Sequence, residues 1–309
     1  MAAWTAKPYS GLVTRAVPGL DSRARAIWNA ALFWVVGELA LQPLLGNAVG
    51  ALLRAWHLGG GLSASLIALF EMATLLMVVV LTALFGFFEG RNFWDYGLPL
   101  AQAFRARFWE GFLVGAVWPG IVALLMIALG GMRVAGFALH GWGLLSAAAA
   151  WFGAMVIVGL SEEMWFRGYL LQTLRRGIGF WAAAIVLSLW FTGEHYFFKQ
   201  GENIWDCITL FAFGMLICFS VLRTGSLWFG VGLHAAFDFM QIFVIGTRNG
   251  GQVPVAHLLD VSFPGPAWVN GGSLGTEASV LMYPLFVAVF AYVALRFPRR
   301  STGRHARGT

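Results

Sequence analysis

Long hydrophobic runs, separated by short polar connections, make up most of the chain. About 20 consecutive apolar residues are needed to cross a bilayer as a helix. Eight runs are long enough, and we predict a transmembrane helix in each. Their approximate bounds are 26–46, 63–88, 108–130, 142–174, 179–198, 204–222, 227–246 and 279–297. The pattern predicts an all-α, polytopic integral membrane protein of about eight transmembrane helices.

The composition agrees with this prediction. Hydrophobic residues are 59% of the chain and charged residues 11%, with a mean hydropathy of +0.75. Soluble domains contain about 25% charged residues. No polar stretch is long enough to form a soluble domain. We therefore expect a single membrane domain over residues 1–309.

The distribution of basic residues predicts the orientation. Eight crossings place both termini on one side of the membrane. Of the 20 Lys and Arg residues, 15 lie on that side, and Arg167 lies inside a run. The four on the opposite side are Arg54, Arg133, Lys199 and Arg248. Because basic residues concentrate in cytoplasmic connections, we expect both termini to be cytoplasmic, in the cell membrane. This topology explains the net charge of +6 without nucleic acid as a partner.

Ionisable residues interrupt the fourth run at Ser161-Glu162-Glu163-Met164-Trp165-Phe166-Arg167-Gly168. Such groups are costly at membrane depth and usually line a bundle interior or a wet cavity. Glu163 and Arg167 are four residues apart, the spacing of a helical ion pair. Glu162 points about 100° away around the helix. The run is too long for one simple crossing, so we expect it to project, bend or break near residues 159–161.

Two further polar motifs lie in later runs. The pattern Phe-x-x-x-His ends at His195, and His234 precedes Asp238 by four residues. Glu162 and His195 are each roughly 25 Å from the intervening turn, at 1.5 Å per helical residue. An antiparallel hairpin places them at one depth, where they can form an acid–base pair. Single acids in the first two runs, Glu38 and Glu71, are expected to be protonated, hydrogen-bonded or near water.

The residues alone leave several interpretations open. His234 and Asp238 can bind each other, ligate a metal such as zinc together with His195 and Glu162, or hydrogen-bond a substrate carbonyl. The same acids also suit a non-catalytic scaffold or an ion-coupled carrier. The chain contains no His-Glu-x-x-His helix and no Gly-x-Ser-x-Gly elbow.

The three motifs, in this order, resemble those of the CPBP family of intramembrane glutamic endopeptidases. That family includes the type II CAAX prenyl proteases and the bacteriocin-processing (Abi) proteins. The resemblance covers about residues 155–240. It implies a catalytic core of about 142–246, variable N-terminal helices over 26–130, and a C-terminal helix at 279–297 with a basic tail at 298–309.

The resemblance implies metal-independent peptide-bond hydrolysis, without a cofactor. The substrate would be a membrane-associated peptide or protein, either prenylated and CAAX-like or bacteriocin-like. Glu162 would be the general base that activates water, and His195 would hold that water. Glu163 and Arg167 would support the site.

His234 and Asp238 would stabilise the oxyanion of the tetrahedral intermediate. Prenyl proteases usually have Asn at the last position, and an ionised carboxylate would repel an oxyanion. Asp238 must therefore be protonated, orient another donor or serve a different function. We expect the cavity formed by these helices to open to the cytoplasmic side.

Overall fold

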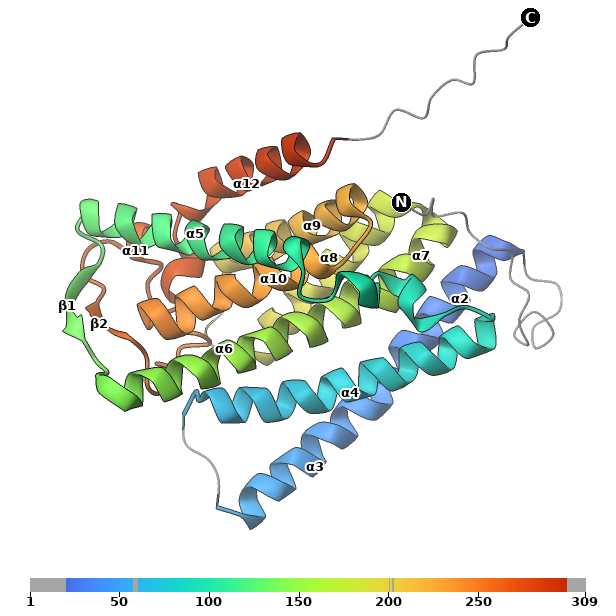
Figure 1. Cartoon of the computed structure of the whole chain (residues 1–309), viewed down its shortest axis with the longest axis horizontal. Helices are drawn as coiled ribbons and strands as arrows, with labels where there is room; N and C mark the ends of the chain where they lie inside the picture. The colour runs from blue at the N-terminus through green and yellow to red at the C-terminus, as the bar shows by residue number, and fades with distance from the viewer. Residues whose placement is uncertain (1–20, 58–60, 200, 202, 299–309) are drawn as a thin grey trace, which may run out of the picture.

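The computed structural model describes residues 21–57, 61–199, 201 and 203–298. The described residues form helices joined by short connections, with one two-stranded antiparallel ribbon (Figure 1). In chain order the elements are α2 (Ser22–Trp34), η1 (Val35–Leu41), α3 (Gln42–Ala55), α4 (Ala64–Glu89), η2 (Phe93–Tyr96), η3 (Leu100–Gln102), α5 (Ala106–Ala128), β1 (Arg133–Phe137), α6 (Gly141–Glu163), η4 (Met164–Leu170), α7 (Leu171–Ile178), α8 (Phe180–Phe198), α9 (Ile204–Thr224), α10 (Trp228–Asp238), η5 (Phe239–Ile245), β2 (Leu259–Ser262), α11 (Ala267–Asn270), η6 (Gly275–Ala278) and α12 (Met282–Arg296).

Six helical segments are long and apolar enough to cross a membrane. They are Ser22–Ala55, Ala64–Glu89, Ala106–Ala128, Gly141–Ile178, Ile204–Thr224 and Trp228–Ile245. The helix α12 is apolar but shorter. The helix α8 carries Glu194 and His195 near its end, which lower its hydropathy. The prediction of an all-α polytopic membrane protein is confirmed, whereas the count of eight crossings stays a prediction.

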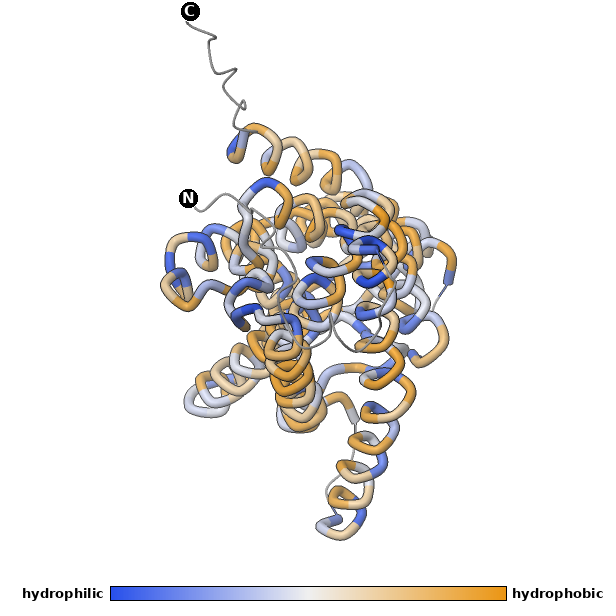
Figure 2. The backbone as a smooth tube through the Cα atoms, turned by 90° about the vertical axis from the view of Figure 1, so that its right-hand side faces the viewer, coloured by the Kyte–Doolittle hydropathy of each residue, from blue (hydrophilic) through white to orange (hydrophobic). Residues whose placement is uncertain are grey.

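Apolar side chains cover the outside of the bundle as well as its core. Leu113, Val287 and Leu295 are exposed, although a soluble protein would bury most such residues. In Figure 2 the hydrophobic colour follows most helical turns, and hydrophilic positions also occur among the inner helices. A lipid environment accounts for the apolar exterior.

Helix α10 lies inside the bundle, packed against α5 and α6. Three glycines permit the close approach of α10 to α5. A Cβ atom built on Gly111, Gly115 or Gly232 would lie 2.0–2.1 Å from a backbone oxygen of the facing helix. Small residues at four-residue spacing allow membrane helices to pack this closely. The packing fixes α10, which carries His234.

The fourth predicted run is broken, but not near residues 159–161. A regular helix continues through Ser161, whose single hydroxyl hydrogen is shared between Glu71 and the Val158 carbonyl, one turn back. Those bonds satisfy the polar side chain without interrupting the helix. The break follows in the π-helical segment η4, where Gly168 has φ −74° and ψ −111°. The expected position of the break was therefore wrong.

The two ends of the bundle differ in structure. The start of α2 and the end of α7 lie at the right of Figure 1, and α12 runs along the top, away from the left end. At the left, the strand β1 from the α5–α6 connection pairs with β2 from the connection between η5 and α12. The short helices α11 and η6 belong to that same connection. We call the left end, which carries this ribbon, the ribbon end.

Candidate active site

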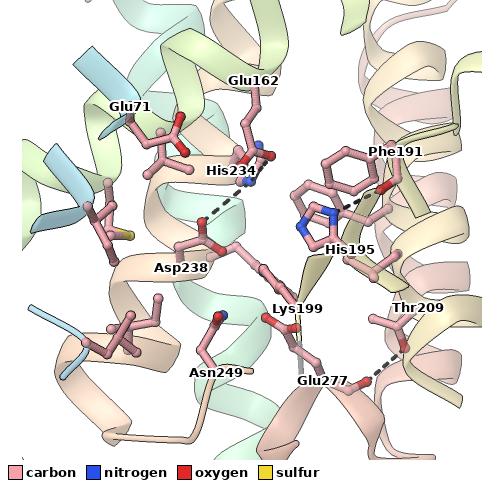
Figure 3. Close-up of a pocket in the computed structure, with 18 residues that line it drawn as sticks. Glu71, Glu162, Phe191, His195, Lys199, Thr209, His234, Asp238, Asn249 and Glu277 are labelled. Carbon is pink, nitrogen blue, oxygen red and sulfur yellow. Dashed lines mark hydrogen bonds and ion pairs between the residues drawn. The ribbon is translucent and has the colours of Figure 1, made fainter. Parts of the chain in front are cut away.

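A cavity of about 230 Å³ lies within the bundle (Figure 3). Helices α4, α6, α8, α9 and α10 supply most of its walls, together with the connections at the ribbon end. Its polar and ionisable lining residues are Glu71, Glu162, His195, Lys199, Thr209, His234, Asp238, Asn249 and Glu277. Four of the six expected site residues are among them, and the remaining two, Glu163 and Arg167, lie behind the wall.

Glu163 and Arg167 form the expected ion pair. The Arg167 Nη1 atom lies 3.3 Å from both carboxylate oxygens of Glu163, and both side chains are 0% exposed. The guanidinium group also lies over the Phe191 ring, 4.9 Å from its centroid. A buried pair of this kind is strongly destabilised when one partner is removed.

Glu163 also holds His234. Its Oε1 atom lies 2.7 Å from the His234 Nδ1 atom. A carboxylate paired with Arg167 only accepts hydrogen bonds, so the His234 Nδ1 atom must carry a hydrogen. The ring edge is further fixed by Phe213, whose centroid is 4.9 Å away. The second ring nitrogen, Nε2, is left to face the cavity.

Two more carboxyl groups face the His234 Nε2 atom. Asp238 Oδ2 lies 3.5 Å from it, and Glu162 Oε2 lies 3.8 Å from it. Both separations exceed those of a good hydrogen bond. Both carboxyl groups are therefore within ion-pair distance of His234 without a hydrogen bond to it. Glu162 makes no ion pair with Arg167 among the described residues, as its helix face predicted.

Glu162 and His195 line the same cavity. The Glu162 side chain is 22% exposed, and its Oε2 atom has no hydrogen-bond partner in the described part of the chain. The His195 Nδ1 atom lies 2.9 Å from the Phe191 carbonyl oxygen, to which it can only donate. In the neutral ring, the His195 Nε2 atom is therefore a hydrogen-bond acceptor.

Sequence reasoning missed three charged residues of the cavity. Lys199 directly follows α8, and its position four residues after His195 is the signal that could have found it. Glu71 was noted only as an isolated acid; as expected, it is hydrogen-bonded, here by Ser161, but it also faces the cavity. Glu277 comes from η6, and nothing in the sequence connects it with the motifs.

Glu277 is held firmly at its place in the wall. Gln241 Nε2 donates to its Oε1 atom over 3.0 Å, and the Thr209 hydroxyl donates to its carbonyl oxygen over 2.8 Å. Burial, with a smaller contribution from the nearby Asp206 carboxylate, raises the pKa of Glu277 to about 8. Its protonation therefore changes near neutral pH.

Part of the cavity wall comes from connections between helices. Four of the lining residues belong to them, namely Leu62, Lys199, Asn249 and Glu277. These connections are at the ribbon end, whereas the connections with most basic residues are at the other. The expected cytoplasmic opening of the cavity stays a prediction.

The zinc interpretation requires several ligands around one point. Within residues 21–57, 61–199, 201 and 203–298, no group of three or more His, Cys, Asp and Glu side chains has an arrangement that could hold a metal ion. The two cysteines, Cys207 and Cys218, are not in the cavity wall. The geometry gives the zinc interpretation no support.

The central part of the chain is similar to a known protein family. Residues 144–240 match the family described as type II CAAX prenyl endopeptidase Rce1-like. The chain is also 25% identical over 158 residues to the uncharacterized protein YyaK of Bacillus subtilis (strain 168), and the match covers 49% of each protein. The chain thus spans about half the length of that curated relative. The matched range contains all six expected catalytic residues. Residues 144–240 are therefore similar to the Rce1-like CAAX protease family, as the three motifs had indicated.

Proposed function

We propose that the chain is an intramembrane glutamic endopeptidase that hydrolyses a peptide bond with water activated by Glu162. One observation carries the proposal. Glu162 lines a cavity that it shares with His195 and His234, and among the described residues its buried Oε2 atom has no hydrogen-bond partner. A general base needs this combination of a free acceptor and room for water. The family match supports peptidase activity in general.

Water activation would use both Glu162 and His195. A water molecule between them can donate one hydrogen to the Glu162 carboxylate and the other to the His195 Nε2 atom. Glu162 then takes the proton as the water oxygen attacks the substrate carbonyl. When the tetrahedral intermediate collapses and the C–N bond breaks, Glu162 returns that proton to the leaving amine.

His234 would stabilise the oxyanion through its Nε2 atom. Because Nδ1 already donates to Glu163, Nε2 can donate only if the ring is an imidazolium. Negative charge on Asp238 and Glu162, both within 4 Å of Nε2, favours that form. Glu163, fixed by Arg167, orients the ring. Asp238 then lies beside the His234 donor. It acts either as an anion that stabilises the imidazolium form of His234 or as a neutral second hydrogen-bond donor to the oxyanion.

The proposed substrate is a peptide segment associated with the membrane. The cavity lies inside an apolar bundle and has room for only a short stretch of chain. Prenylated CAAX-like and bacteriocin-like peptides remain the candidate classes. No metal or cofactor takes part in this proposal.

The test is peptide turnover by the purified protein in lipid. Membrane-associated peptides are incubated with the parent and with Glu162→Gln, and mass spectrometry identifies new termini. We expect cleavage by the parent alone, and unchanged cleavage after treatment with a chelator. Loss of activity in the chelator, restored by zinc, would instead support the metal interpretation. Equal product from both proteins would refute the assignment of Glu162.

A further inference from the structure

A second cavity lies in the connection between η5 and α12, at the ribbon end. Its volume is about 380 Å³, within the usual range of small-molecule sites. Its lining residues all belong to the segment 246–275, and none of them lines the candidate active site. The proposed peptidase chemistry therefore does not account for this cavity.

Hydrogen bonds between side chains and backbone hold the segment in shape. The side chain of Asn270, a residue that is 5% exposed, donates to the Phe263 carbonyl oxygen over 2.9 Å and accepts from the Gly272 N–H over 2.8 Å. The Thr247 hydroxyl oxygen accepts from the Thr276 N–H over 3.0 Å. The cavity is thus pre-formed, which lowers the cost of ordering it around a ligand.

Two glycines make the close contacts of the wall possible. Gly246 has φ +73°, and a Cβ atom built on it would lie 2.4 Å from the His257 ring. Gly275 has φ +78°, and a Cβ atom there would lie 1.9 Å from the Thr247 hydroxyl oxygen. Any other residue at these positions would be strained and would displace its neighbour. The shape of the cavity therefore depends on these glycines.

The wall carries positive charge and no acid. Its charged or polar side chains are Arg248, His257 and Ser262. Arg248 is exposed and forms no ion pair among the described residues. Asp260, the only acid within residues 246–275, is not a lining residue. Arg133 pairs with Ser262 across the ribbon, so a second guanidinium group is attached close by. This charge distribution favours an anionic ligand.

The His257 ring is held so that one nitrogen remains for a ligand. Its Nδ1 atom lies 2.8 Å from the Pro254 carbonyl oxygen, to which it can only donate. In the protonated ring the Nε2 atom is then a second donor, and an anion beside the ring favours that form. A guanidinium group, an imidazolium N–H and a hydroxyl group are suitable donors for the oxygens of a phosphate group.

The rest of the side chains in the wall are apolar, namely Val253, Val261 and Phe263. The segment begins directly after Trp228–Ile245, one of the helices long enough to cross a membrane. The ends of such helices reach the depth of the lipid headgroups. We propose that the cavity binds a phosphate group through Arg248, His257 and Ser262. The phosphate group can come from a lipid headgroup, with the apolar wall beside its chains, or from free phosphate.

A binding experiment on the purified full chain in detergent tests this site without a peptidase assay. Inorganic phosphate and a water-soluble, short-chain phosphatidic acid are titrated separately, and the midpoint of thermal unfolding reports binding. Phosphatidylcholine with the same chains is the zwitterionic counterpart. The variants are Arg248→Gln and, as a second test of the same wall, His257→Gln. Arg54→Gln, which replaces an exposed basic residue of α3 outside the wall, is the matched control.

We expect a saturable rise in the melting temperature of the parent and of Arg54→Gln. The affinity should fall about tenfold to a hundredfold in Arg248→Gln, the usual effect of losing a hydrogen bond to a charged group, and it should also fall in His257→Gln. Saturation by phosphatidic acid alone would identify a lipid headgroup as the occupant, and saturation by inorganic phosphate at similar concentrations would identify free phosphate. The proposal would be overturned if neither probe saturates, if phosphatidylcholine binds as tightly as phosphatidic acid, or if both wall variants keep the affinity of the parent.

Discussion

Two adjacent glutamates experience different surroundings because they lie on different helix faces. Glu162 reaches the cavity, whereas Glu163 is completely buried against Arg167 and His234. Glu162→Gln should leave thermal stability close to that of the parent. Glu163→Gln should lower it, since stranding one partner of a buried ion pair costs about 3–5 kcal/mol. Thermal unfolding of both variants in detergent measures the difference, and equal shifts would contradict the separation of their roles.

Asp238 occupies the position where prenyl proteases usually have Asn. Its carboxyl group faces His234 Nε2, so an amide in the same place can still supply an N–H to the oxyanion. A lost oxyanion donor typically costs about 10²–10³ in rate. We predict that Asp238→Asn lowers the cleavage rate by no more than about tenfold, a smaller loss than the removal of one oxyanion donor causes. Asp238→Ala should lose much more. An inactive Asp238→Asn variant, measured by peptide turnover, would indicate an essential anion.

Glu277 should make stability depend on pH. Burial raises its pKa from 4.5 to about 8, so the folded protein holds the proton more tightly than the unfolded chain. The stabilisation is complete below the unfolded pKa and is lost as the pH rises through the folded value. We expect the melting temperature to fall between about pH 5 and about pH 9, and Glu277→Gln to reduce that fall. The control is Asp260→Asn, which replaces an exposed acid in β2. An unchanged pH profile in Glu277→Gln would contradict the assignment.

At the scale of elements, the close contact between α5 and α10 positions the site. Gly115→Ala places a methyl group 2.1 Å from the Leu233 carbonyl oxygen, so α10 must move and carry His234 with it. Overpacking of this kind costs about 1–3 kcal/mol. Gly120→Ala is the matched control in the same helix, because its methyl group meets only the end of Met240 at 3.8 Å. We predict lower thermal stability and lower peptide turnover for Gly115→Ala alone. Equal thermal stability and equal peptide turnover in the two variants would contradict the claim that this contact positions α10.

The hydrophobic pattern of the sequence was sufficient to predict the long helices but not the irregularities within and between them. Hydrophobic run length located every long helix of the described residues. Motif spacing related Glu162 to His195, and the family resemblance added His234, which lines the same cavity. The break at Gly168 could not be predicted, because a glycine in an apolar run fits a straight helix equally well. Glu277 was missed because its position in the cavity wall depends on how a long connection folds, and that connection has no helical periodicity in its sequence. Long-range contacts of this type leave no local signal.

At the scale of the whole molecule, the start of α2 lies at the end opposite the ribbon, and α12 runs away from the ribbon end (Figure 1). The basic-residue bias predicts that this end is cytoplasmic. Reporter fusions after Arg176 and at the C-terminus should both report cytoplasm, and a fusion near Gly250 should report the opposite side. A cytoplasmic signal near Gly250 would contradict the predicted topology.

The central claim is that Glu162 activates the water that cleaves a peptide bond. The most direct measurement is the initial rate of cleavage by Glu162→Gln relative to the parent, in lipid and with a chelator present. The two proteins are first matched for folded yield and thermal unfolding. We predict a loss of at least about 10²–10⁴-fold, the usual contribution of a general base. A rate for Glu162→Gln within about tenfold of the parent would contradict the account, since no general base contributes so little.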